Sequence, residues 1–375
     1  MPDTQMSALG HITVLDLTRL LPGAVATQTL ASFGARVIKI EQPKIGDYAR
    51  HGFGSSTSLN PLFTATNGGK QSLSLDLKRE EGKRILCELV ERADILVESF
   101  RPGVMERLGL GYAHLASLNP GLIYVALTGY GQSGEYAQLA GHDLNYLAMA
   151  GVLNEIGSPD RPAMPNVQLA DIAGGSFQVL IGALTALESR HCTGLGQFVD
   201  VSMTDGSAAL LPVPLSAFQA TGRLTQRGNE MLSGRYACYN LYQAADQRWL
   251  SVAALEAKFW AELCTELGCP QFIEHQFASE PRQQEVKDAI ARIFQNKTAL
   301  EWFEQLKHKD CCVAPVRDLK EVSEQPAMRT PKLMGTPAIQ PANTPALGEH
   351  TRAILEEIGY SNEKFDELKQ SGVIE

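Results

Sequence analysis

Two side chains near the middle of the chain have the residue types needed to move a proton. His142 lies in the segment AGHDLNY and Asp171 in QLADIAGG. Each is expected at the start of a helix, where free backbone N–H groups face a ligand. The apolar and glycine residues after Asp171 would exclude water from its carboxyl group and raise its pKa. An imidazole and such a carboxyl group together suit proton transfer.

Simpler roles remain open for both residues. Asp171 could serve simply as a helix cap, and His142 could be a buried histidine whose ring nitrogens are hydrogen-bonded. A third segment, GYGQSG at 129–134, fits GxGxxG and follows the strand-like LIYVALT. No long helix follows it directly, and no strand ending in an acidic residue stands about 20 residues later. We therefore interpret these glycines as a turn that shapes the site, and not as a dinucleotide loop.

The elements that must position these residues alternate over the first 200 residues. Such alternation is typical of parallel βαβ units in an α/β domain. Ligands of such sheets bind beyond the carboxyl ends of the strands, so we expect the site in the loops there. Strands are predicted at 12–17, 36–41, 72–77, 94–99, 122–128 and 197–202, and helices at 24–33, 79–92, 143–153, 172–189 and 204–219.

The pattern changes after residue 220. A polar linker at 221–235 precedes an alternating segment at 236–254, which predicts an antiparallel hairpin. Further helices are predicted at 257–268, 284–308, 349–358 and 361–370, and a proline-rich strap at 326–345. We predict three parts: a large α/β domain with a parallel sheet over 1–220, a smaller α+β domain over 225–320, and a C-terminal strap with helices over 321–375 that returns to the large domain.

Composition disfavours several classes of protein. With 44% hydrophobic and 20% charged residues among 375, the chain resembles an ordinary folded protein. Its net charge of −9 disfavours nucleic acid as a partner. The 7 cysteines form no CxxC pair, so we expect neither a disulfide framework nor a metal site. We find no signal-peptide pattern and no unbroken apolar run long enough to span a membrane, and expect a cytoplasmic location.

Several motifs, in order, resemble those of the class III CoA-transferases, the family that also contains α-methylacyl-CoA racemases. The resemblance covers nearly the whole chain. It implies a Rossmann-like large domain, a small domain and two chains interlocked as a homodimer. The matching segments are LPG at 21–23, GARVIKIE at 34–41, Lys70 with LDLK at 75–78, ESFRPG at 98–103, GYG at 129–131, the His142 and Asp171 segments, and GEHT at 348–351.

The resemblance also implies roles for individual residues. Asp171 matches the catalytic aspartate of the family, and His142 matches the second acid–base group of its racemases. Glu256 matches a glutamate that pairs with that histidine, although a solvated charge at a helix start is an equally simple interpretation. Acyl-CoA would be the substrate, with no prosthetic group. The residues expected to bind CoA are Leu75, Lys78, Arg101, Gly141, Asp143, Asn145, Tyr146 and Lys70.

The chemistry implied by the racemase branch suits these residue types. A proton α to a thioester is weakly acidic, so its removal needs a positioned base and a stabilised enolate oxygen. Inversion needs one acid–base group on each face of the carbon. His142 and Asp171 would share one proton, so their apparent pKa values would belong to the pair. Backbone N–H groups near Asp143 would hold the enolate oxygen.

The sequence therefore predicts an epimerase acting on 2-methyl-branched acyl-CoA in lipid metabolism. One alternative is a CoA-transferase with a covalent intermediate on Asp171, and another is a non-catalytic CoA-binding protein. Two features depart from the racemases: LSGR at 232–235 replaces LDGG, and Gln42 stands where arginine is common, with Lys44 expected to substitute for it. The poly-glycine loop of formyl and oxalate transferases is absent, which disfavours the transferase alternative.

Overall fold

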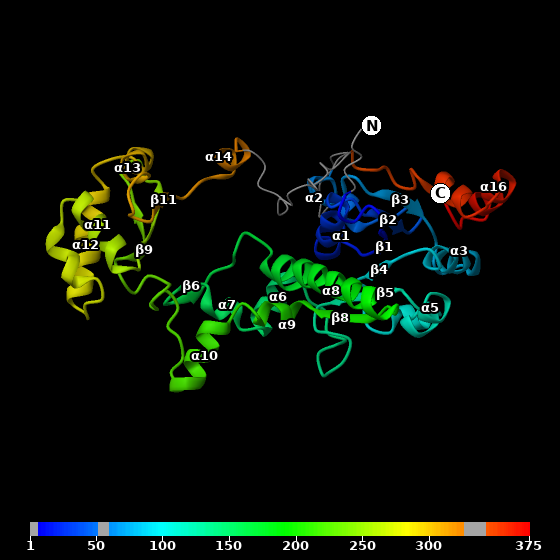
Figure 1. Cartoon of the computed structure of the whole chain (residues 1–375), viewed down its shortest axis with the longest axis horizontal. Coiled ribbons are helices and arrows are strands. Elements are labelled where there is room, and N and C mark those ends of the chain that lie inside the picture. The colour runs from blue at the N-terminus through cyan, green and yellow to red at the C-terminus, as the bar shows by residue number, and fades with distance from the viewer. Residues whose placement is uncertain (1–6, 52–59, 326–342) are drawn as a thin grey trace. The chain divides into compact units, whose positions relative to one another are not determined.

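The computed structural model describes residues 7–51, 60–325 and 343–375, which fall into two compact units (Figure 1). The first unit takes Met1–Val152, Pro165–Pro212 and Thr330–Glu375, and the second takes Leu153–Met164 and Val213–Arg329. The second unit thus includes a short segment from within the region predicted as the large domain. Hydrogen bonds from Thr225 to Glu155 and from Arg227 to Ser158 tie that segment to the second unit.

A six-stranded parallel sheet forms the centre of the first unit, which confirms the predicted α/β class. Its order is β3-β2-β1-β4-β5-β8: β2 and β3 are added on one side of β1, and β4, β5 and β8 on the other. A crevice for ligands opens where the strand order reverses in this way. The strands are β1 (Thr13–Leu17), β2 (Arg36–Glu41), β3 (Gln71–Ser74), β4 (Ile95–Glu98), β5 (Ile123–Thr128) and β8 (Phe198–Ser202).

The central strands are almost wholly buried because helices cover both faces of the sheet. Every residue of β4 and β5 is buried. The C-terminal helices belong to this unit: the Ser74 N–H donates to Thr351 Oγ1 over 3.1 Å, beside β3. Further helices of this unit are α1 (Pro22–Ser32), α2 (Pro61–Asn67), α3 (Glu80–Val90), α4 (Val104–Arg107), α5 (Tyr112–Leu118), α15 (Thr351–Glu357), α16 (Asn362–Gln370) and the short η1 (Tyr48–Arg50).

The helix that carries Asp171 begins as a π-helical segment, Ala170–Ser176, and continues as α8 (Phe177–Thr193). Its first turn lies unusually close to α9 (Met203–Ala208). A Cβ added to Gly174 would lie 2.5 Å from the Met203 carbonyl oxygen, and one added to Gly206 would lie 2.1 Å from the Gly174 carbonyl oxygen. These two glycines therefore permit the close approach that places Asp171.

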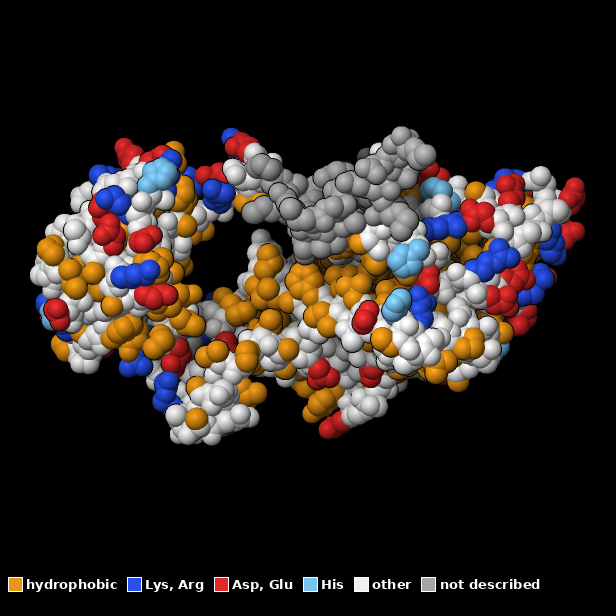
Figure 2. Space-filling view, viewed as in Figure 1, with side chains coloured by type: hydrophobic (Ala, Val, Ile, Leu, Met, Phe, Trp, Pro, Cys, Tyr) orange, Lys and Arg blue, Asp and Glu red, His pale blue; other side chains and the backbone are white. Residues whose placement is uncertain are grey.

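One side of α8 packs against β5 and β8. Its outward stripe is apolar: Phe177, Ile181 and Leu184 are 50%, 58% and 44% exposed. Figure 2 shows apolar side chains gathered over the region of this helix. Among the described residues, Ala170–Thr193 is long and apolar enough, by length and composition alone, to cross a membrane: an 18-residue window within it has a mean hydropathy of 1.4. Polar and charged residues such as Asp171, Gln178 and Glu188 interrupt this segment, so it contains no unbroken apolar run.

Three predicted helices are each two helices in the structure. The segment 143–153 divides into α6 (Asp143–Met149) and α7 (Val152–Glu155) around Gly151, whose φ is +81°. The segment 204–219 divides because Pro212 begins α10 (Pro212–Thr221), as proline favours a first helical position. The segment 284–308 divides into α12 (Arg282–Phe294) and α13 (Ala299–Leu306), since Thr298 and Glu301 form a capping box.

The second unit is built on the hairpin predicted at 236–254, formed by β9 (Tyr239–Gln243) and β10 (Trp249–Ala253). A third strand, β11 (Val313–Pro315), pairs antiparallel with β10. Trp260, Phe294 and Trp302 lie in the core beside this sheet. The remaining elements are β6 (Gly157–Ser158), β7 (Arg161–Pro162), α11 (Ala257–Glu266), η3 (Pro270–His275) and α14 (Leu319–Ser323). Most of the predicted strap at 326–345 lies outside the described residues.

Gly174→Ala tests the contact between the two helices. The new methyl group would collide with backbone, so we expect the free energy of unfolding to fall by about 1–3 kcal/mol. Urea denaturation measures the change. Thr185→Ala, at an exposed position of α8, is the control and should change it by less than about 0.5 kcal/mol. Equal effects of the two substitutions would contradict the proposed tight contact.

Candidate active site

A pocket of about 500 Å³ lies in the first unit, at the carboxyl ends of the central strands. Its walls come from the loops that follow β1, β4 and β5 and from the starts of α6 and the Asp171 helix. This is the crevice that the strand order predicts. The predicted residues that line it are His142, Asp171, Arg101, Gly141, Asn145 and Tyr146.

His142 is the residue immediately before α6, with an extended backbone. Its N–H donates to Asn145 Oδ1 over 3.1 Å, and its side chain is exposed at the pocket. The interpretation as a buried structural histidine is therefore wrong. The Tyr146 hydroxyl donates to the Gly141 carbonyl oxygen over 2.5 Å and so fixes the residue before His142.

The glycine turn at 129–134 does shape the site. A Cβ added to Gly129 would lie 2.3 Å from Tyr146 Cε1, and one added to Gly141 would lie 2.7 Å from the same atom. The Thr204 hydroxyl donates to the Gly129 carbonyl oxygen over 2.7 Å. The tyrosine ring thus packs between glycines in the pocket wall.

Asp171 is mostly buried and stands inside the first turn of its helix, so it is not the capping residue. Its N–H donates to Asp143 Oδ1 over 2.9 Å. Burial raises the pKa of the Asp171 carboxyl group to about 7, and the nearby negative charge of Asp143 adds to this rise. A group with such a pKa is present in both protonation states near neutral pH, which suits an acid–base role.

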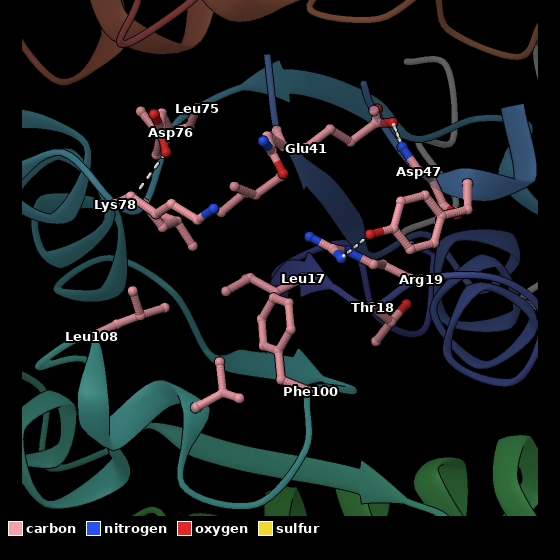
Figure 3. A pocket seen from close by; sticks show the side chains of 16 residues that line it. Leu17, Thr18, Arg19, Glu41, Asp47, Leu75, Asp76, Lys78, Phe100 and Leu108 are labelled. Atoms are coloured by element: carbon pink, nitrogen blue, oxygen red, sulfur yellow. Dashed lines mark hydrogen bonds between the residues drawn. The ribbon is translucent and has the colours of Figure 1, made fainter. Parts of the chain in front are cut away.

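A second pocket, of about 300 Å³, lies at the carboxyl ends of β1, β2 and β3 (Figure 3). Leu75 and Lys78, two of the residues expected to bind CoA, line it, and their contact with CoA stays a prediction. Arg19, Tyr48 and Phe100 line both pockets. The two pockets therefore meet at these three side chains.

At the junction between the pockets, the Arg19 guanidinium group lies against two aromatic rings. The Arg19 guanidinium carbon lies 4.9 Å from the centre of the Tyr48 ring and 5.3 Å from that of Phe100. Arg19 Nη1 also donates to the Tyr48 hydroxyl over 3.0 Å. Arginine stacks well on aromatic faces and pairs with phosphate, so this residue suits an anionic ligand.

Sequence reasoning did not identify Arg19, Tyr48 and Phe100 as site residues. Two signals were available: Arg19 comes soon after the first predicted strand, and Phe100 lies in the quoted ESFRPG motif. Lys44 was expected to replace a missing arginine. The second pocket is lined by Gln42 and Arg19, and Lys44 is not among its described lining residues.

Three predicted residues lie elsewhere. The Lys70 ammonium group is fully buried and contacts Asp16, Asn67 and a carbonyl oxygen, so the predicted contact with a ligand phosphate is wrong for this structure. Asp143 lines neither of the two described pockets and instead holds the Asp171 N–H. Glu256 lies in the second unit, exposed, just before α11. Its pairing with His142 stays a prediction.

Within the described ranges, no group of three or more His, Cys, Asp or Glu side chains is arranged to hold a metal ion. The family model named CoA-transferase family III matches residues 9–351. The chain belongs to this family. The members of this family are enzymes that act on CoA thioesters. The parallel α/β sheet of this chain agrees with the fold expected for the family.

Relatives within CoA-transferase family III include both predicted activities. The chain is 38% identical to the α-methylacyl-CoA racemase of Homo sapiens over 390 residues, covering 98% of each protein. It is 37% identical to the acetyl-CoA:oxalate CoA-transferase of Acetobacter aceti, covering 84% of this chain and 82% of the relative. A solved CaiB/BaiF family structure from Brucella suis matches with a TM-score of 0.79 and 28% identity, covering 92% of this chain and 98% of the other.

Asp171→Asn should change how stability depends on pH. A pKa of about 7 in the folded protein, above the usual 3.8, means that the stability this group contributes at low pH is lost as pH rises through 7. Asparagine does not ionise. We therefore expect the melting temperature of Asp171→Asn, relative to wild type, to increase between pH 5 and pH 8. Asp160→Asn, at an exposed position, should show no such trend, and parallel wild-type and Asp171→Asn profiles would contradict the raised pKa.

Proposed function

We propose that this protein is a racemase or epimerase acting at the α-carbon of 2-methyl-branched acyl-CoA thioesters. The observation that carries the proposal is the presence of His142 and Asp171 in the wall of one pocket. The two side chains come from the starts of separate helices, which allows them to approach a substrate carbon from different sides. The identity of 38% and 37% to the racemases of Homo sapiens and Mus musculus supports the same branch.

In the proposed reaction, one group removes the α-proton and the other returns a proton to the opposite face. Starting from neutral His142 and protonated Asp171, the imidazole takes the proton and the carboxyl group gives one up. The reverse direction starts from imidazolium and carboxylate. The raised pKa of Asp171, about 7, brings its proton affinity close to that of an imidazole. Asp171 is then present both as the acid and as the carboxylate near neutral pH, as the two directions require.

The two pockets suggest how acyl-CoA is placed. We assign the nucleotide part of CoA to the smaller pocket and the thioester to the larger one. Arg19 at their junction, Lys78 in the smaller pocket and Arg101 in the larger one supply positive charge for phosphates. Lys78 and Arg101 are exposed and can move to meet them.

A CoA-transferase is the second candidate. In that reaction the Asp171 carboxylate attacks the thioester carbonyl, forming an anhydride and releasing the CoA thiolate. The 37% identity to the Acetobacter aceti transferase favours this reading, as does the partly buried carboxyl group. An imidazole in the same pocket favours the racemase, because the transferase chemistry does not need it.

We further propose that the protein acts as a homodimer, in the cytoplasm and in lipid metabolism. The exposed apolar stripe of α8, formed by Phe177, Ile181 and Leu184, supports a dimer because it is the kind of surface that a second chain covers.

Deuterium exchange separates the two candidate reactions. A racemase should incorporate deuterium from D₂O at the α-carbon of a 2-methylacyl-CoA without any acceptor acid, because the proton passes through exchangeable side chains. Mass spectrometry of the recovered thioester measures this. A transferase should instead pass CoA to an added carboxylate and give an enzyme acyl intermediate that hydroxylamine intercepts. Transfer without deuterium incorporation would overturn the racemase proposal.

His142→Ala tests the two-base mechanism. Only Asp171 would remain to remove a proton, so exchange from at least one enantiomer should fall by about 10²-fold or more. Exchange from (2R)- and (2S)-2-methylacyl-CoA is measured separately. His308→Ala, which changes an exposed histidine of the second unit, is the control. Wild-type rates from both enantiomers in His142→Ala would exclude His142 as a base.

A further inference from the structure

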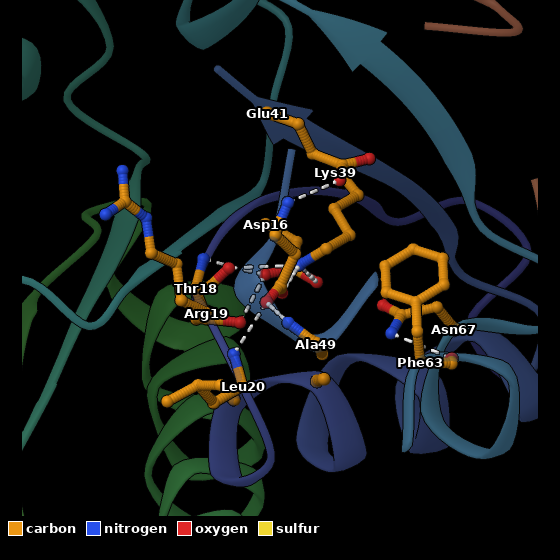
Figure 4. A network of polar contacts seen from close by, with 12 residues as sticks. Asp16, Thr18, Arg19, Leu20, Lys39, Glu41, Ala49, Phe63 and Asn67 are labelled. Atoms are coloured by element: carbon orange, nitrogen blue, oxygen red, sulfur yellow. Dashed lines mark hydrogen bonds and ion pairs between the residues drawn. The ribbon is translucent and has the colours of Figure 1, made fainter. Parts of the chain in front are cut away.

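The proposed reaction leaves a set of buried charges unused. They lie around Asp16 and Lys39, near the carboxyl ends of β1 and β2 (Figure 4). The side chains of Asp16 and Lys39 are 0% exposed and that of Asp47 is 1% exposed. Removing ions from water costs several kcal/mol for each, so such a set persists only when its members are closely paired.

Lys39 connects the two loops that follow β1 and β2. Its Nζ donates to the Thr18 carbonyl oxygen over 3.0 Å and pairs with Asp47 Oδ2 at 2.9 Å. The other carboxylate oxygen of Asp47 accepts from the N–H groups of Leu20 and Ala49, at 3.0 and 2.9 Å. A single ammonium group therefore joins residues 18–20 to residues 47–49.

The loop after β1 has a conformation that needs such support. Leu20 has a φ of +62°, in the left-handed region that costs about 1–2 kcal/mol for a residue with a side chain. Asp16 Oδ1 accepts from both the N–H and the hydroxyl of Thr18, at 2.9 and 2.6 Å, and Asp47 holds Leu20. The buried charges thus fix the backbone on both sides of Arg19.

The same two loops carry the side chains that meet between the pockets. Arg19 stands between Thr18 and Leu20, and Tyr48 stands between Asp47 and Ala49. Their side chains are hydrogen-bonded at 3.0 Å and line both pockets. Each is thus flanked on both sides by a residue that Lys39 or Asp47 holds.

We propose that Lys39 is a positioning residue for acyl-CoA, which holds Arg19 and Tyr48 together at the junction of the two pockets without touching the ligand. This inference rests on the proposed function, in which Arg19 faces the phosphates of CoA. Lys39 acts through Arg19, so its removal weakens CoA binding only when Arg19 is present.

Lys70 provides a matched control within the same network. Its ammonium group is also 0% exposed and pairs with Asp16 Oδ2 at 3.0 Å. Its other contacts are the Ala24 carbonyl oxygen at 3.0 Å and Asn67 Oδ1 at 2.8 Å, in α1 and α2. Lys70 thus shares the burial and the carboxylate partner of Lys39, but none of its described hydrogen bonds reaches residues 18–20 or 47–49.

The experiment is a double-mutant cycle on the dissociation constant of CoA, measured by calorimetry with the full chain. We expect Lys39→Met to raise this constant about ten-fold and Lys70→Met to change it less than about two-fold, although both lower the melting temperature. In an Arg19→Ala background, Lys39→Met should add less than about two-fold. Equal effects of the two lysine variants, or an unchanged effect of Lys39→Met in Arg19→Ala, would overturn the proposal.

A milder variant covers the case in which Lys39→Met does not fold. Asp47→Asn keeps the oxygen that accepts from Leu20 and Ala49 but removes the charge that pairs with Lys39. It should weaken CoA binding in the wild-type background and have no effect in Arg19→Ala. Weakening of the same size in both backgrounds would refute the positioning role.

Wild-type measurements distinguish failure of this inference from failure of the proposed function. A wild-type protein that binds CoA but gives no deuterium exchange contradicts the racemase and leaves the lysine comparison decisive for positioning. A wild-type protein that does not bind CoA overturns both. Exchange with wild-type protein, together with equal dissociation constants for Lys39→Met and Lys70→Met, overturns the positioning role alone.

Discussion

The pairing of β1 with β4 decides where this protein can hold a ligand. The chain leaves β1 toward β2 on one side and leaves β4 toward β5 on the other side. The loops after β1 and β4 therefore diverge at the carboxyl edge of the sheet. Arg19 follows β1 and Phe100 follows β4, and both line the two pockets. The remaining elements, including α6 and the Asp171 helix, complete walls around an opening that the strand order creates.

The two proton-transferring candidates have opposite surroundings in this opening. Asp171 is largely removed from water beside Asp143, which raises its pKa to about 7. His142 is exposed at the pocket, and its backbone N–H donates to Asn145 Oδ1. Burial thus moves the pKa of the Asp171 carboxyl group into the neutral range, where it can both give up and take back a proton. A shared proton between them is then possible near neutral pH.

A network of buried charges lies at the same carboxyl edge of the sheet, near the ends of β1 and β2. Asp16 and Lys39 lie opposite each other on neighbouring strands, and both side chains are 0% exposed. Burial and ion pairing act in opposite directions on Asp16, and its positively charged neighbours win, so its pKa is lowered. Desolvation wins for Lys70, whose pKa falls to about 8. An apolar core would avoid these costs, so the network is explained better by the loops it holds than by stability.

Local patterns were sufficient for the α/β class, the parallel strands and the hairpin of the second unit. The parallel strands are short, continuously buried apolar runs, whereas burial alternates along the hairpin strand β10. The family motifs pointed to His142 and Asp171, which do share a pocket. Patterns failed where a single residue divides a helix, as Pro212 and the Thr298 capping box do.

Only the tertiary structure decided which charged residues face a ligand. Lys70 and Lys78 are both lysines close in sequence to β3, yet one is buried against Asp16 and the other lines a pocket. Arg19 was not recognised because its role depends on Tyr48 and Phe100, which come from other loops. The physical reason is that burial and charge pairing join residues distant along the chain, whereas a sequence pattern records only near neighbours.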